Sequence, residues 1–367
     1  MPVGIQQRLY YMSRVKQADY RTKTNFNTAA PYNFVEVQVE DTDLSDYQPE
    51  TRNNKGYSTR SYFATDVYLF RHGMSTRKRF DVASDQIGRW LYFALGGVAS
   101  AQPDAGGNPL VYRHTFSLLN PDVTLQPPAF TWGEKVGGGL DHQFPSCCVR
   151  RLRISAEDVG RLKGEVELVG SGKRIDAPGL VLPPTANYNL PALPALTFFT
   201  GAQSVLTVAD ADTLANPIAY CTNLQVNSWS VEFVRTLLED DAYRICGGDF
   251  QTANDADSGA VRSELLQSDF DITINMQVRV ESGSAEYTAL QTNKRLDWKQ
   301  IITGALISGA FNHKLTLNAV FAAYEAVQVG NQNGLVVFNI TVKPLFNAST
   351  GNIFSAILDN KTASYLV

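Results

Sequence analysis

The clearest pattern in the chain is a strict alternation of apolar and polar residues from Phe270 to Val280. An alternation of this length predicts a long β-strand with one dry face and one wet face. The apolar members are expected to pack on a core, because they all point to the same side. The wet face carries Asp271, Thr273, Asn275, Gln277 and Arg279.

A helix is predicted from Ser84 to Leu95, because apolar residues recur there at helical spacing. Ser84 and Asp85 are suitable N-caps, and Gly96-Gly97 forms a stop. The apolar face would be formed by Ile87, Trp90, Leu91, Ala94 and Leu95. We expect this helix to lie alongside a β-sheet.

The remaining patterns predict strands. Alternating segments at 149–156 and 162–169, joined by a turn at Val159-Gly160, predict a β-hairpin. In its second strand Lys163, Glu165 and Glu167 would face outward. Further strands are expected over 61–71, 76–82, 113–118, 224–235 and 335–342.

The same order of elements occurs twice. In the first half a strand at 76–82 leads into the helix at 84–95 and then into a histidine-bearing strand at 113–118. In the second half the strand at 270–280 leads into a helical segment at 285–290 and a histidine-bearing strand at 312–317. A long repeat of this kind indicates two copies of one domain.

The expected fold class is mainly β, with two tandem β-sandwich domains that each have one flanking α-helix. Five prolines between 176 and 196 predict a semi-rigid linker, since proline is excluded from helix interiors and central strands. The expected parts are an N-terminal arm with one strand at 1–59, a first domain at 60–175, the linker at 176–196, a second domain at 197–346 and a C-terminal tail at 347–367. The tail is expected to form a short helix or an arm.

The one strand of the N-terminal arm is predicted at 35–40. Val35, Val37 and Val39 alternate there with polar residues, which is typical of a half-buried strand. Two interpretations fit this pattern. The three valines could belong to an extended arm that lies on a neighbouring subunit, or to an ordinary edge strand behind a flexible leader.

Composition and charge narrow the function classes. The chain has 367 residues and a formal net charge of -4, with both signs interspersed. Proteins that grip nucleic acid through their overall field carry dense cationic surface, so this class is not expected. The start of the chain does not resemble a signal peptide, and no stretch approaches the roughly 20 apolar residues that a membrane span needs. Cys147, Cys148, Cys221 and Cys246 are expected to be free thiols in a reducing cytosol.

We find no catalytic or metal-binding motif in the sequence. The segment 170–174 lacks the glycine and hydroxyl positions of a phosphate loop, and 254–259 lacks two ligand positions of a calcium loop. The histidines are scattered, and His114 and His313 occupy matching places in the repeat, which favours structural hydrogen bonds. No nucleophile stands at a credible spacing from a base. The chain is therefore expected not to be an enzyme and to need no cofactor or metal.

The sequence resembles the tail tube proteins (major tail proteins) of long-tailed bacteriophages, in the version with a duplicated tube domain. The resemblance covers most of residues 60–345 and rests on patterns that shape the fold. These patterns are the helix ending in Ala94-Leu95-Gly96-Gly97, the strand at 112–116, the segments 128–133 and 148–155, the hairpin partner at 168–170, and the segments 223–231 and 301–304.

The resemblance implies a structural virion protein that forms stacked rings around a channel for DNA ejection. Because the domain is duplicated, three chains are expected to form one pseudo-hexameric ring. The implied partners are other copies of the chain, the tape measure protein, the tail terminator and distal tail proteins, with double-stranded DNA passing non-specifically and no membrane involved. The implied location is the phage tail, after assembly in the host cytoplasm.

In such a ring the wet face formed by Asp271, Thr273, Asn275, Gln277 and Arg279 is expected to face the lumen. The alternative is that this face lies on the outside of the domain. A tail terminator or capsid decoration protein is a rival function, because these are built on similar sandwiches. A two-domain carbohydrate-binding or hydrolytic module is less favoured, with Asp240-Asp241 beside Tyr243 as its nearest candidate site.

Overall fold

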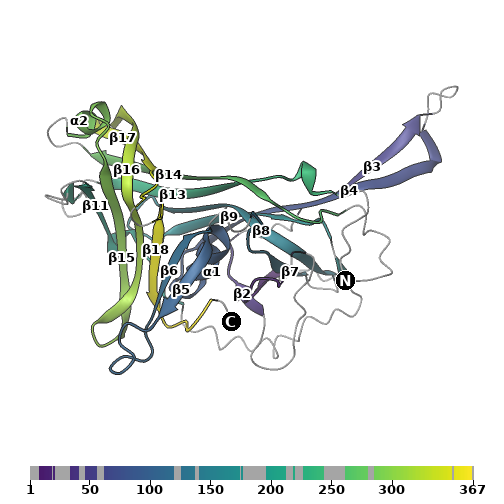
Figure 1. Cartoon of the computed structure of the whole chain (residues 1–367), viewed down its shortest axis with the longest axis horizontal. Coiled ribbons are helices and arrows are strands. Elements are labelled where there is room, and N and C mark those ends of the chain that lie inside the picture. Colours follow the sequence, from purple (N-terminus) through teal and green to yellow (C-terminus); the bar gives the residue numbers. More distant parts are fainter. Residues whose placement is uncertain are drawn as a thin grey trace.

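The computed structural model describes residues 8–18, 20, 34–40, 46–55, 62–119, 125–136, 140–173, 175–176, 196–211, 218–219, 226–243, 261–279, 285–348 and 351–365. The fold is mainly β, as the alternating patterns predict (Figure 1). The proline-rich linker expected at 176–196 lies almost entirely outside the described residues.

Strands dominate both halves of the chain. The first half contains β1 (Arg8–Ser13), β2 (Phe34–Val37), β3 (Asp46–Lys55), β4 (Tyr62–Asp81), α1 (Ser84–Leu95), β5 (Gly96–Ala101), β6 (Tyr112–Leu118), β7 (Phe130–Val136), β8 (Leu140–Ala156), β9 (Lys163–Gly170) and β10 (Ile175–Asp176). The second half contains η1 (Gly201–Gln203), β11 (Ser204–Asp210), β12 (Ile218–Ala219), β13 (Val226–Leu237), η3 (Asp240–Ala242), β14 (Gln267–Arg279), α2 (Ala285–Gln291), β15 (Leu296–Ser308), β16 (Phe311–Gln332), β17 (Leu335–Pro344) and β18 (Ser355–Asn360).

Helix α1 has the bounds that its apolar spacing predicts, and its buried face holds the five expected apolar side chains. Gly96 ends it in the left-handed region at φ 101°, as a C-terminal glycine does at low cost. The expected N-cap is wrong. Ala83 occupies that position without a side-chain cap, and Ser84 is already the first helical residue, fully buried against the rest of the fold.

One long antiparallel sheet runs through both halves, in the order β3-β4-β9-β8-β13-β14-β17-β16. It consists of two runs of four strands with the same order, because β3-β4-β9-β8 is followed by β13-β14-β17-β16. The runs join where β8 pairs with β13, from Trp229 opposite Ala156 to Val234 opposite Arg151. We call this whole set of strands the long sheet. Because the long sheet is continuous, the expected division of the chain into two separate sandwiches stays a prediction.

Two long strands leave the long sheet at their N-terminal ends and build the other layers. The first part of β8 pairs with β7, and the chain turns into the long sheet near Ser146, whose φ is 63°. The first part of β16 pairs with β15 on one side and β18 on the other, and β18 pairs in turn with β6. In Figure 1 β15, β18 and β6 hang below the β13–β14 side of the long sheet, whereas the β3–β4 hairpin projects away from the body.

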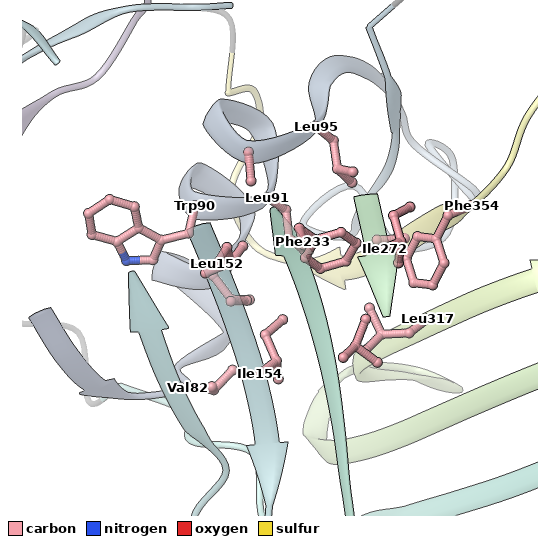
Figure 2. Packing of buried hydrophobic residues seen from close by; sticks show 14 of the residues in the cluster. Val82, Trp90, Leu91, Leu95, Leu152, Ile154, Phe233, Ile272, Leu317 and Phe354 are labelled. Atoms are coloured by element: carbon pink, nitrogen blue, oxygen red, sulfur yellow. The ribbon is translucent and has the colours of Figure 1, made fainter. Parts of the chain in front are cut away.

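One large hydrophobic core contains buried residues from both halves. Figure 2 shows Trp90, Leu91 and Leu95 of α1 above the strands, with Leu152 of β8 and Phe233 of β13 among the side chains beneath. All five are buried. Both halves therefore contribute side chains to the same core.

The expected helix or arm at the C-terminal end is wrong, because β18 is a strand that lies between β6 and β16. These are the two histidine-bearing strands of the repeat. The Arg113 guanidinium holds the Asp359 carboxylate at 2.7 and 2.8 Å. Tyr365 is fully buried, and its ring lies so close to Gly88 that a Cβ there would be 2.2 Å from Cζ. This segment therefore fastens the first half to the second.

The two buried histidines should make the fold sensitive to mild acid. Burial lowers the pKa of both His114 and His313 from the ordinary 6.5, although Asp359 faces the first and Asp85 the second. The unfolded chain then binds protons more readily, so the free energy of unfolding is highest above pH 6.5 and falls as the pH drops below it. We expect a lower melting temperature at pH 5.5 than at pH 7.5. A double variant His114→Gln/His313→Gln should lose most of this difference, and an equal or higher melting temperature at pH 5.5 would contradict it.

Candidate functional site

Strand β14 has the two faces that its alternation predicts. Ile272, Ile274, Met276 and Val278 are buried on one side. On the other side Asp271, Asn275 and Arg279 are exposed, and Thr273 and Gln277 are half-buried. We call the side of the long sheet that carries the second group the polar face. Its opposite side, against α1 and the core, is the core face.

The polar side chains of β14 are paired with those of neighbouring strands. Asp271 accepts a hydrogen bond from the Lys343 ammonium on β17. Asn275 accepts one from the Thr341 hydroxyl at 3.1 Å, and Gln277 donates to Asn339 at 2.9 Å. Thr273 lies opposite Glu232 of β13. Arg279 forms no ion pair with any residue that the structure describes. We call the group on β14, β16 and β17 that consists of Asn275, Gln277, Gln328, Asn339 and Thr341 the amide cluster.

In the first half the polar face is charged. Glu165 of β9 lies between β4 and β8, and its carboxylate is 2.6 Å from Arg77 Nη2, 3.4 Å from Arg79 Nε and 3.5 Å from Arg151 Nη1. Arg151 also contacts Glu232 at 2.5 Å. Burial alone would raise the pKa of Glu165, but the hydrogen bonds and charges of the three arginines lower it. We call Glu165 with Arg77, Arg79 and Arg151 the arginine cluster.

The arginine cluster and the amide cluster occupy equivalent places in the two four-strand runs. A β-bulge between Val149 and Arg151 of β8 matches a bulge between Tyr324 and Ala326 of β16, which aligns the two registers. Residues at the same distance after each bulge take equivalent positions, so a row of cross-strand partners in the first run is equivalent to a row in the second. The first row is Arg79, Glu165 and Arg153, and the second is Gln277, Asn339 and Gln328. Charged groups in one half are replaced by uncharged amides in the other.

The last part of β16 forms an edge of the long sheet within the described residues. Beyond Ala322, no strand in the described part of the chain pairs with β16 on the side away from β17. Val329 lies there on the core face and is 58% exposed, whereas its equivalent in the first run, Ile154, is fully buried beside β13. Val336 of β17, which lies opposite Asn331 of β16, is 51% exposed. An open edge with uncovered apolar side chains is typical of a surface that pairs with another chain.

The opposite edge of the long sheet is formed by β3 and β4. In β4 the segment 76–81 pairs with β9 on one side, and on the other side the Arg79 carbonyl accepts a hydrogen bond from Glu40 at 2.7 Å. One end of the long sheet is therefore formed by β3 and β4, the first strands of the first run. The other end is formed by β16, the last strand of the second run. The junction inside the chain joins strands in the same two positions, because β8 is the last strand of the first run and β13 is the first strand of the second run.

The three valines of the arm lie on the chain's own body. β2 pairs with β1, and β1 pairs with β7. Val37 is buried in the core, and Val35 and Val39 pack against it. A role for this segment between subunits stays a prediction, which the contacts within one chain do not test.

The remaining candidate residues have structural partners. The Tyr243 hydroxyl donates a hydrogen bond to the His72 carbonyl at 2.7 Å, and Arg71 and Arg262 lie over its ring. Asp240 is fully solvated 3.6 Å from Arg71. Cys147 and Cys148 are free and buried. Within the described ranges, no three acidic, histidine or cysteine side chains gather as a metal ion would require, and no helix is long and apolar enough to cross a membrane.

No protein-family model matches the chain, and no curated protein is significantly similar to it. The candidate functional surface is therefore defined by geometry. It consists of the polar face, with its charged and uncharged halves, and the two unlike ends of the long sheet. Sequence patterns indicated the outward direction of Glu165, but its arginine partners depend on strand register and were missed.

Proposed function

We propose that this chain is a structural protein of the phage virion that polymerises into stacked rings and forms the tail tube, the conduit through which DNA enters the host. The observation that carries this proposal is the junction between β8 and β13. There the last strand of one four-strand run pairs with the first strand of the next. The same kind of contact can form between chains, because the long sheet of each chain ends in β3 and β4 on one side and in β16 on the other.

Ring closure follows from this repetition. The open edge of β16 in one chain would pair with the β3–β4 end of the next, which covers Val329 as β13 covers Ile154. Edge pairing removes unpaired backbone groups, and a closed barrel leaves no edge. Since each chain supplies two runs, three chains complete a pseudo-hexameric ring. Each ring then stacks on the next, and the tape measure, terminator and distal tail proteins are the expected partners in the virion.

The polar face is then the lining of the channel, and Asp271, Thr273, Asn275, Gln277 and Arg279 belong to it. Duplex DNA sticks to surfaces that replace its counterions with lysine and arginine. On this face most described cations contact a carboxylate, and the amide cluster carries no charge. A lining of this kind allows passage without tight binding. The role is non-catalytic.

Electron microscopy of the purified protein tests the proposal. We expect long hollow tubes, and images averaged along the tube axis should have threefold symmetry with two similar lobes per chain. Single rings that never stack would favour a tail terminator. A protein that stays monomeric over a wide range of concentrations in light scattering would overturn the proposal, and six identical subunits per ring would overturn the trimeric version.

A further inference from the structure

We propose that the last part of β16 pairs, in one fixed register, with strand β3 of a second copy of the chain. The two strands run antiparallel, and the pairs are Ala326 with Gln48, Val327 with Tyr47 and Gln328 with Asp46. We call these three pairs the junction ladder. The inference rests on the proposed function, because the second copy is the neighbour in the ring, and it specifies which residues of the two chains meet.

The two four-strand runs share a second irregularity besides the bulges of β8 and β16. The β3–β4 pairing shifts register directly after Glu50, and the β13–β14 pairing shifts directly after Thr236. The partner of Glu50 on β4 lies eight residues before Arg79, and the partner of Thr236 on β14 lies eight residues before Gln277. Since Arg79 and Gln277 are already equivalent, one alignment fits both irregularities. This alignment makes β3 the counterpart of β13, residue by residue.

The β8–β13 junction inside the chain is the template for the junction ladder. Three of its pairs are Arg151 with Val234, Leu152 with Phe233 and Arg153 with Glu232. In the alignment of the two runs, the three residues of β8 correspond to Ala326, Val327 and Gln328 of β16. The three residues of β13 correspond to Gln48, Tyr47 and Asp46 of β3. The contact that one chain makes between its own halves can therefore form between two chains in the same register.

The start of β3 lies within the long sheet, as its counterpart in β13 does. Asp46 is opposite Ser75 of β4, and Ser75 also pairs with Val169 of β9 on its other side. In the described part of the chain, β3 pairs with β4 alone. The backbone groups on the outer side of β3 can therefore pair with a strand from another chain, as the backbone of an edge strand does in β-strand addition.

Pro49 fits the proposed register and disfavours a slip. Proline has no amide hydrogen, so it interrupts a ladder wherever a donor is needed. In the proposed register Pro49 comes opposite Glu325, the extra residue in the bulge of β16, where the ladder ends. Its counterpart Arg235 likewise comes directly after the last residue of β13 that pairs with β8. A slip of two residues along β16 would place Pro49 opposite Val327, inside the ladder.

The second copy is expected to offer β3 and not its own β16. Pairing of β16 with β16 would join two chains through identical surfaces, so the assembly would stop at two chains with both β3 edges uncovered. The internal junction joins unlike strands, β8 and β13. Pairing of β16 with β3 repeats this unlike contact, and repeated unlike contacts close into rings.

Paired cysteines in the full-length protein test the register. Opposite residues of an antiparallel pair have Cα atoms about 4.5–5.5 Å apart, which a disulfide can bridge, whereas a displacement by two residues exceeds its limit of about 7 Å. The predicted pairs are Asp46→Cys/Gln328→Cys and Gln48→Cys/Ala326→Cys. The matched controls exchange the partners, as Asp46→Cys/Ala326→Cys and Gln48→Cys/Gln328→Cys. After mild oxidation, denaturing gels without reductant should shift only the predicted pairs from single chains to closed covalent trimers.

Further controls identify the linked residues. Wild type keeps its own four cysteines and should stay as single chains on the same gels. The single variant Gln328→Cys should also stay as single chains, and covalent dimers from it would indicate β16–β16 pairing and overturn the inference. Mass spectrometry of digested trimers should find the two introduced cysteines joined. Circular dichroism establishes that each variant is folded.

The outcomes separate the junction ladder from the proposed function. The ladder is overturned if neither predicted pair cross-links, or if an exchanged pair cross-links as fully as the predicted ones. Micrographs of the same samples record tube formation independently. Tubes without the predicted cross-links would contradict the ladder and leave the proposed function standing. Covalent trimers that never stack into tubes would contradict the tail tube and leave the ladder standing, and single chains throughout would contradict both.

Discussion

Replacing Val329 with lysine should abolish ring and tube formation while leaving the isolated chain folded. Val329 is 58% exposed in the single chain, so the substitution costs the monomer little. In a ring the same position would be covered, as Ile154 is at the internal junction. The variant loses about 1.5 kcal/mol of valine burial and places an unpaired ammonium in an apolar contact, which costs several kcal/mol more. In the proposed ring of three chains, three such junctions would close the ring, so these losses would add.

Val205→Lys is the matched control. Val205 is also a valine on a strand, 40% exposed, but it lies on β11 in the layer away from the long sheet. We expect tubes from this variant and from wild type, and monomers from Val329→Lys, in sedimentation and electron microscopy. Normal tubes from Val329→Lys would contradict the assignment of β16 as an assembly edge. Loss of folding in its circular dichroism spectrum would contradict the claim that Val329 is open in the single chain.

The second large effect concerns an ion pair inside the core. Lys78 and Glu134 are almost completely buried, with Nζ and Oε1 3.8 Å apart. The Lys78 ammonium also lies 4.4 Å from the centre of the Tyr10 ring, and Glu134 accepts a hydrogen bond from Trp132 Nε1 at 3.0 Å. Glu134→Leu would leave the lysine charge buried without this carboxylate. Such single removals cost about 3–5 kcal/mol.

Unfolding by urea, followed by circular dichroism at one fixed protein concentration, measures this cost. Fixing the concentration matters because the proposed assembly would stabilise the folded chain by mass action. The double variant Lys78→Met/Glu134→Leu fills the same space with apolar groups and should recover most of the loss, because apolar replacement of a buried pair is often neutral. A loss below about 1 kcal/mol for Glu134→Leu would show that the pair is not held as a charged pair.

Local elements were predictable where one physical rule dominates. Helix α1 has an apolar stripe and a glycine stop, and β14 has strict alternation, so both were found within a few residues. The segments 61–71 and 76–82 were expected as separate strands but form the single strand β4, because nothing local indicates that the polar residues between them stay extended. The strand β18 was missed because its place between β6 and β16 is decided by partners far away in the chain.

The candidate surface was predictable only in part. The wet face of β14 follows from its own sequence. The pairing of β8 with β13 does not, because cross-strand partners are chosen by the packing of both halves on one core. The arginine cluster needs three strands in register, and a shift of one residue would turn Glu165 toward the core. Register is a property of the folded sheet, so this cluster became visible only in three dimensions.

The position of β18 has a consequence for synthesis on the ribosome. This strand is made after every strand with which it pairs, and its contact between Arg113 and Asp359 spans 246 residues. At translation rates of 5–20 residues per second, β6 waits roughly 10–50 s for its partner. During that interval β6 lacks the strand that links it to β16. The contact that joins β6 to β16 through β18 therefore forms only after almost all of the given sequence has been made.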